Sequence, residues 1–277
     1  MKGSQVEDIK IQRICSGEIS EAADKVAVEE PLQLQVVYST ATGQMLKDIA
    51  VTMRTPGNDE ELAAGFLFTE GIIKSAEVIS EIKHAHVDEN VVQVILKENI
   101  IPALGNAARN FYTTSSCGVC GKASIEAIQT HSQYGDVKND HLIPAAIFYS
   151  LQNELKQQQK VFEDTGGIHA SALFDGDGKF IILREDVGRH NALDKIIGAA
   201  MLKKGLPLNN CILLLSGRAS FELVQKAVMA GIKVIAAVGA PSSLAVEMAK
   251  ENEVTLIGFL KEGRFNIYSS KERISLQ

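Results

Sequence analysis

Residues 211–259 read CILLLSGRASFELVQKAVMAGIKVIAAVGAPSSLAVEMAKENEVTLIGF, and this stretch decides the fold. Three short apolar runs in it have the length of strands, and the two segments between them have the apolar spacing of helices. The predicted strands are 212–215, 234–238 and 254–259, and the predicted helices are 221–230 and 242–251. Because strands that are apolar throughout are buried on both faces, this alternation predicts a parallel sheet covered by helices, with Cys211 as a buried thiol.

The three predicted strands end in loops that are suited to an anion. The loops are 216–220, 239–243 and 260–264, and they contain small residues or cations, with Ser216, Gly217 and Arg218 in the first. The carboxyl ends of parallel strands lie at one edge of a sheet, where ligands bind. Each loop alone is typical of an ordinary strand-to-helix turn with a serine cap. Three such loops at one edge of the sheet, two of them with arginine, favour a ligand that carries phosphate. No Walker A or GxGxxG motif is present.

The rest of the chain predicts a division into three parts. Residues 1–30 are polar and weakly patterned and are expected to be loosely ordered. Residues 31–105 are expected to form a small α+β domain, and residues 106–277 an α/β domain. The further predicted strands are 32–38, 47–53, 87–96 and 180–183, and the further predicted helices begin at Asp59, Pro144 and Asn191.

The composition is that of an ordinary globular protein. The chain has 277 residues, of which 45% are hydrophobic and 22% charged, and a formal net charge of −6. This acidic balance gives no electrostatic footprint for nucleic acid or an anionic membrane. The N-terminus has no apolar signal region and no run is long enough to span a membrane, so a cytoplasmic protein is expected. Four cysteines are too few for a disulfide scaffold in a chain of this length.

Two polar clusters contain histidines that a structural role does not readily explain. In the first, Gly166 and Gly167 precede His169, which suggests close backbone approach to another group. The second, residues 184–191, is dense in charge for a strand-to-helix junction and contains His190. A capping aspartate and a surface ion pair would explain part of the second cluster. They leave His169 and His190 as candidate contacts of a ligand.

A pair of cysteines, Cys117 and Cys120, lies among glycine and hydroxyl residues before a predicted helix, which suggests a flexible loop that favours a thiolate. A structural zinc site lacks further ligands beside the pair. A zinc deaminase is disfavoured because the H-x-E motif is absent, His169 being followed two residues later by serine. A thioredoxin-type context is also absent. The interpretation that remains is a thiolate that carries a group covalently. A persulfide is the natural form of such a carried group on cysteine.

Five blocks of sequence resemble the formate dehydrogenase accessory sulfurtransferase family (FdhD). They are 116–121, 165–170, 185–195, 216–222 and 258–264, and the resemblance extends from about residue 30 to the end. It implies a cytidine-deaminase-like α/β domain, with a helix-covered mixed or parallel sheet, in a homodimer. It also implies a sulfur carrier that takes sulfur from a cysteine desulfurase and passes it to the molybdenum cofactor, bis(molybdopterin guanine dinucleotide), before the cofactor enters formate dehydrogenase.

The resemblance also assigns residues. Cys117 would form the persulfide, with Cys120 as its partner. The segment Phe259, Leu260, Lys261, Glu262, Gly263 and Arg264 would contact the cofactor, for which GDP is an analogue, and Glu262 stands where the family has proline. No tightly bound metal of the protein's own is expected. The alternative function is a chaperone that shelters the cofactor without handling sulfur.

Overall fold

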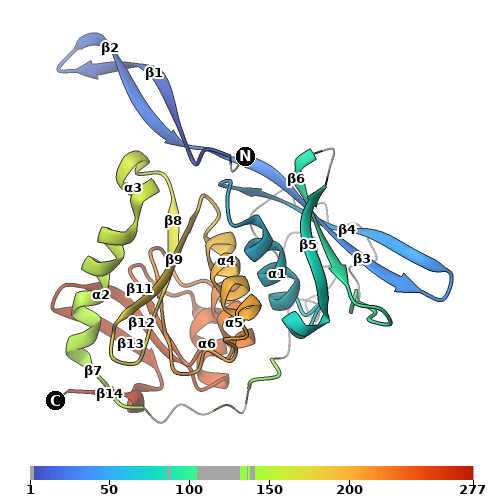
Figure 1. Ribbon diagram of the computed structural model, residues 1–277. Coiled ribbons are helices and arrows are strands. Elements are labelled where there is room, and N and C mark those ends of the chain that lie inside the picture. The colour runs from blue at the N-terminus through green and yellow to red at the C-terminus, as the bar shows by residue number, and fades with distance from the viewer. Residues whose placement is uncertain (1–2, 86–87, 105–131, 136, 138–140, 277) are drawn as a thin grey trace.

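The computed structural model describes residues 3–85, 88–104, 132–135, 137 and 141–276 (Figure 1). Its central element is a six-stranded sheet with the strand order β13-β12-β11-β10-β8-β9. The three predicted strands are β10 (Ile212–Leu215), β11 (Val234–Ala237) and β12 (Thr255–Lys261), and they are parallel. The other three strands, β8 (His169–Phe174), β9 (Phe180–Asp186) and β13 (Arg264–Ser269), run antiparallel to their neighbours. The expected mixed α/β sheet is therefore confirmed.

Helices cover both faces of this sheet because its central strands are apolar on both sides. Leu213, Leu215 and Ile235 pack with α4 (Arg189–Leu202), α5 (Phe221–Met229) and α6 (Ser243–Glu251). Their neighbours Ile212 and Leu214 join a second cluster with α2 (Ala145–Gln158). The short helix α3 (Lys160–Thr165) continues from α2 toward β8.

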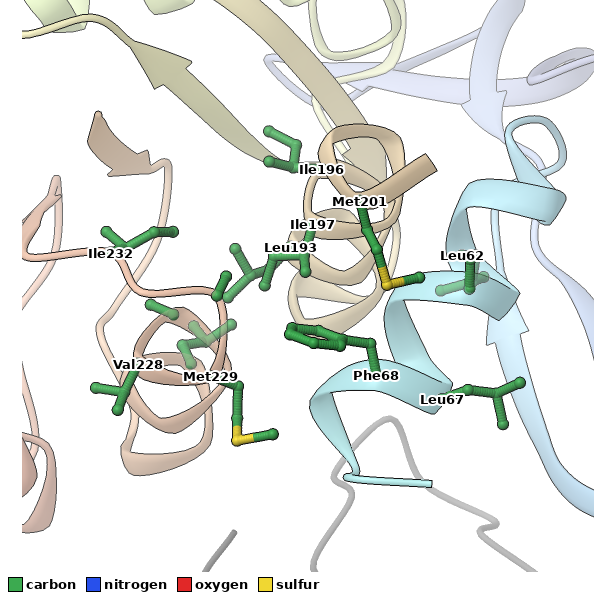
Figure 2. Close-up of a cluster of buried hydrophobic side chains, with 14 of the residues drawn as sticks. Leu62, Leu67, Phe68, Leu193, Ile196, Ile197, Met201, Val228, Met229 and Ile232 are labelled. Atoms are coloured by element: carbon green, nitrogen blue, oxygen red, sulfur yellow. The ribbon is translucent and has the colours of Figure 1, made fainter. Parts of the chain in front are cut away.

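A second sheet of four strands, in the order β4-β3-β6-β5, lies on the far side of α4 (Figure 1). Its strands are β3 (Glu30–Thr40), β4 (Gly43–Arg54), β5 (Ile79–Ala85) and β6 (Asp88–Leu96), of which β5 was not expected from the sequence. Helix α1 (Asp59–Thr69) lies between this sheet and α4. Figure 2 shows Phe68 of α1 pointing toward Leu193 of α4 and Met229 of α5. One hydrophobic core thus joins the small sheet to the large one.

The N-terminal segment differs from the expectation of loose order. It forms a ribbon of two antiparallel strands, β1 (Val6–Cys15) and β2 (Glu18–Ala27), that extends away from the body (Figure 1). Its pairing comes from backbone hydrogen bonds along both strands, which a mostly polar sequence does not reveal. The ribbon contacts α3, where Lys25 forms a 3.0 Å ion pair with Asp164.

Short elements complete the described chain. They are β7 (Ile143–Pro144), which pairs with β14 (Ile274–Ser275), and two single-turn 3₁₀ helices at Ala76–Val78 and Lys271–Arg273. Across the described ranges, no helix has the length and apolarity needed to cross a membrane.

Candidate functional site

The loops after β10, β11 and β12 meet at one edge of the large sheet, as their parallel order predicts. The amide of Gly239 donates to the carbonyl of Gly217 at 2.9 Å, and the amide of Phe259 donates to the carbonyl of Gly239 at 3.1 Å. A side chain at position 239 would lie 3.0 Å from the backbone nitrogen of Arg218, so glycine permits this close approach. The loops after β10 and β11 and residue Phe259 of β12 therefore form one hydrogen-bonded rim.

Ser216 and His169 bring β8 to the same rim. The Ser216 hydroxyl accepts a 2.8 Å hydrogen bond from the Ala170 amide, and the Ser216 amide donates back to the Ala170 carbonyl at 3.0 Å. A Cβ atom on Gly217 would lie 3.5 Å from Nδ1 of His169, so the histidine ring is next to this loop. Partial desolvation lowers the pKa of His169, an exposed residue at the start of β8, and its neighbours Arg189 and His190 lower it further. His169 is therefore a neutral imidazole at pH 7, able both to donate and to accept a hydrogen bond.

His190 is held inside the rim instead of facing solvent. It is buried in the first turn of α4, with Nε2 2.9 Å from a carboxylate oxygen of Glu222 and 3.4 Å from the Ser220 hydroxyl. The ring thus links α4 to the start of α5. Beside it, Nε of Arg189 is buried and has no hydrogen-bond partner in the described part of the chain.

Asp186 fixes the turn that carries Arg189 and His190. Its carboxylate is fully buried, 2.7 Å from Nζ of Lys195, and accepts from the amides of Gly188 and Thr55. Burial raises the pKa of Asp186, and the ammonium group of Lys195 opposes that shift. A surface ion pair and a helix cap were the structural alternatives expected here, but the structure has a buried ion pair that ties β9, α4 and the small sheet together.

A cavity of about 350 Å³ opens beside the rim. Two predicted residues, His169 and Ser216, lie in its wall. The opposite wall comes from α2, α3 and the loop that follows, namely Gln152, Leu155, Lys156, Gln159, Phe162, Gly166, Gly167 and Ile168, with Val238 at the rim. The site is thus a hollow between the sheet edge and the α2–α3 segment.

The segment Phe259–Arg264 lies farther along the edge and does not line this cavity. Lys261 ends β12 and Arg264 begins β13, and both are exposed, as is Glu262 in the turn between them, where Gly263 has a positive φ of 74°. Phe259 is exposed as well. Leu260 was expected to contact the cofactor, but the whole residue is buried in the second core cluster and is not exposed to a ligand.

The α2–α3 wall of the cavity was not expected from the sequence. The sequence predicted a helix that begins at Pro144 but no site residue in the segment that follows it, where Gln159 and Phe162 line the cavity. The one available signal was the Gly166-Gly167 pair, which does line the cavity. Glu185, noted only for local charge density, accepts hydrogen bonds from the amides of Val161 and Phe162 at 3.0 and 2.9 Å and so holds α3 in place.

Cys117 and Cys120 lie outside the described residues. Within the described ranges, no group of three or more histidine, cysteine or acidic side chains is placed to hold a metal ion.

The fold and this rim define an α/β protein with a cavity of about 350 Å³ at the carboxyl edge of its sheet. Residues 27–275 match the FdhD/NarQ family, so the chain belongs to that family and the resemblance seen in the sequence is confirmed. A sulfur carrier protein FdhD of Mycolicibacterium paratuberculosis is 47% identical over 96% of this chain and 97% of that protein. Another, from Saccharolobus solfataricus, is 39% identical over 98% of this chain and 99% of that protein.

A solved structure has the same fold. It is the crystal structure of a protein from Desulfotalea psychrophila described as a formate dehydrogenase accessory protein. The TM-score is 0.74 with 26% identity, over 98% of this chain and 100% of that chain.

Proposed function

We propose that this protein is a sulfur carrier that serves the maturation of formate dehydrogenase. The observation that carries the proposal is the nearly full-length similarity to proteins named as sulfur carriers, at up to 47% identity. The carrier would accept sulfane sulfur from a cysteine desulfurase and deliver it to bis(molybdopterin guanine dinucleotide) before that cofactor enters the catalytic subunit. The protein would act in the cytoplasm as a homodimer.

The transfer itself requires one reactive thiolate. The Cys117 thiolate would attack the terminal sulfur of the desulfurase persulfide, breaking the sulfur–sulfur bond of the donor and forming a new one on Cys117. The desulfurase cysteine leaves as a thiolate, so the step needs no external oxidant. Cys120 would assist delivery or resolve the persulfide.

The rim at the sheet edge supports a role in holding the acceptor. Arg218 and Arg264 are exposed at this edge, and guanidinium groups bind phosphate oxygens in a bidentate manner. The neutral imidazole of His169 and the backbone of the glycine loops add uncharged hydrogen-bonding groups. Such a rim suits the diphosphates of a dinucleotide.

The sulfur-carrier proposal is tested by loading the purified protein with a desulfurase and cysteine and measuring its peptides by mass spectrometry. The Cys117 peptide should gain one sulfur atom, and Cys117→Ala should abolish this gain and formate dehydrogenase maturation in a complemented strain. Cys15 is exposed, so a Cys15→Ser background removes accidental loading. Cys211→Ala is the control, because burial raises the pKa of that thiol and keeps it protonated. Cofactor binding without any sulfur gain would instead identify a cofactor chaperone.

Binding of the acceptor is tested separately with GDP. Replacing both Arg218 and Arg264 by alanine should weaken GDP binding by about a hundredfold or more, since each charged hydrogen bond contributes roughly 1.5–3 kcal/mol and 1.4 kcal/mol is a factor of ten in affinity. Calorimetry measures the affinity, and Arg13→Ala on the exposed β1 strand is the matched control. Equal affinities for the double variant and the unaltered protein would rule out a role for these arginines.

A further inference from the structure

We propose that the outer edge of β1, in the N-terminal ribbon, pairs with β1 of a second copy of this chain, so that two ribbons form one four-stranded sheet across a two-fold axis. The inference rests on the homodimer of the proposed function and names the surface that joins its two subunits. The ribbon extends away from the body and consists of β1 and β2 only (Figure 1). An isolated two-stranded ribbon is marginally stable in water, and a further strand on its edge would stabilise it.

The hydrogen bonding of β1 shows which of its residues direct their backbone groups outward. The amide of Val28 donates to the carbonyl of Gln5 at 3.0 Å, and these two residues continue the β1–β2 register by one pair. The register has no shift along the ribbon. Odd-numbered residues of β1 therefore direct their N–H and C=O groups toward β2, and even-numbered residues direct theirs away from it. The outward residues are Val6, Asp8, Lys10, Gln12 and Ile14.

The two edges of the ribbon differ in what already occupies them. On β2, the outward amide of Lys25 donates to the Asp24 carboxylate at 2.9 Å, and the Lys25 ammonium group pairs with Asp164 of α3 at 3.0 Å. On β1, the Ser4 hydroxyl accepts from the Val6 amide at 3.3 Å, and the described residues place no strand along the rest of this edge. The edge contains no proline and no bulge, two of the features by which proteins keep exposed edges unpaired. Strand β1 is therefore open to a further strand.

The side chains of β1 complement one another in one register. In a two-fold antiparallel pair, outward residues must lie opposite outward residues, so the axis passes through a residue of β1. With the axis at Lys10, Ile9 lies opposite Ile11 of the second copy and Glu7 lies opposite Arg13 of the second copy, and each pair occurs twice. With the axis at Ile9 or at Ile11, a charged side chain lies opposite an isoleucine instead. The pattern of charge and apolarity thus selects the axis at Lys10.

The same register covers the apolar tip of the ribbon. Ile14 and Ile19 lie opposite each other there and are 69% and 68% exposed. In the dimer, Ile14 lies opposite Val6 of the second copy, at the base of the other ribbon. The one like-charge pair is Lys10 with itself at the axis, where Asp8 of the second copy is the diagonal neighbour and within reach of the ammonium group. One surface used twice therefore matches its own charges and covers its own isoleucines, as a two-fold interface requires.

The test measures the dissociation constant of the dimer by analytical ultracentrifugation of the full-length protein and its variants. Lys10→Pro removes the outward amide at the axis, and with it two hydrogen bonds between the copies, so it should weaken the dimer by about tenfold or more. Ala23→Pro is the matched control, because Ala23 lies directly opposite Lys10 and its amide points outward on the β2 edge. This variant should leave the dissociation constant unchanged.

A charge exchange keeps the test independent of any effect of proline on the ribbon. Glu7→Arg and Arg13→Glu each place like charges opposite each other twice in the dimer, and each should weaken it by about tenfold. The two changes combined restore opposite charges and should restore the affinity. Within one ribbon neither residue lies opposite a charge, since Glu7 faces Val26 and Arg13 faces Ser20. Recovery in the double variant therefore reports contact between two copies.

The remaining outcomes separate the inference from the proposed function. A dimer that neither Lys10→Pro nor the single charge variants weaken overturns the inference, and the homodimer of the proposed function stands. A dimer that both proline variants weaken equally, without recovery in the double charge variant, overturns it as well. If the unaltered protein is a monomer at the highest concentration measured, the inference and the homodimer both fail, whereas sulfur loading of Cys117 still tests the carrier function by itself.

Discussion

At the scale of single residues, His169 shows how its surroundings set the chemistry of the rim. The ring begins β8, next to the Gly217 loop, and Arg189 and His190 lie near it. Burial and these two neighbours all disfavour the imidazolium form. A ligand that carries phosphate therefore meets a neutral donor and acceptor at this position.

We predict that His169 titrates below pH 6.5 in the folded protein, as measured by NMR of the histidine rings. Arg189→Gln should raise that pKa without restoring the ordinary value, because burial is the larger cause. The unfolded chain takes up this proton near pH 6.5, whereas the folded chain does so only at lower pH. The contribution of His169 to the free energy of unfolding is therefore complete above about pH 6.5 and declines as the pH falls. His169→Gln identifies the resonance, and an unchanged pKa in the Arg189 variant would contradict the prediction.

At the scale of elements, the crossing of α1 and α4 depends on two glycines. A Cβ atom on Gly65 would overlap the carbonyl oxygen of Asp194, and one on Gly198 would overlap the carbonyl oxygen of Glu61. The two helices therefore touch through their backbones. Lys226 of α5 strengthens the junction, with Nζ 2.9 Å from the Asp194 carboxylate and 2.9 Å from the Thr69 hydroxyl.

Replacing Gly65 or Gly198 by alanine should destabilise the protein by about 1–3 kcal/mol or more, because the helices must separate. The loss should occur even though alanine in a helix interior is favoured over glycine by about 1 kcal/mol. Urea denaturation measures the change in the free energy of unfolding. Gly135→Ala, where the nearest atom lies 3.8 Å from the new Cβ, is the control and should have little effect. A stabilised Gly65 variant would show that the crossing is not tight.

At the scale of the whole molecule, the two sheets share one core and one buried ion pair. The main cluster contains Leu34 and Val94 of the small sheet together with Leu213 and Ile235 of the large one. Lys195 also reaches across, with Nζ donating to the Thr55 carbonyl at 2.8 Å while it pairs with Asp186. The rim that carries His190 is thus attached to the small sheet, and the two parts are expected to unfold together.

Lys195→Met should lower the free energy of unfolding by about 3–5 kcal/mol at neutral pH, because Asp186 is left as an uncompensated buried charge. Without the ammonium group of Lys195 to oppose the effect of burial, the pKa of Asp186 rises further in the folded variant. As the pH is lowered, the folded variant therefore binds a proton at Asp186 while the unfolded chain still has this carboxylate ionised. The deficit should consequently shrink as the pH is lowered toward 5. Urea titrations at several pH values measure it, with exposed Lys203→Met as control. A deficit that does not vary with pH, or two separate transitions, would contradict this account.

The sequence by itself determined the three parallel strands of the large sheet and the edge at which their carboxyl ends meet, but not β8 or β13. Apolar runs and helical spacing are local properties, and parallel order alone places the carboxyl ends of β10, β11 and β12 together. The sequence blocks also identified the family.

Only the tertiary structure decided what surrounds that edge. It buried Leu260, paired Asp186 with Lys195 in the interior, formed the β1–β2 ribbon, and placed Gln159 and Phe162 opposite His169 and Ser216. Each of these features depends on contacts between segments, or on backbone pairing, that side-chain periodicity does not encode. The cavity wall shows this dependence on contacts between segments most clearly. Helical spacing in the sequence predicts that α2 forms, but it does not predict the surface against which the helix packs.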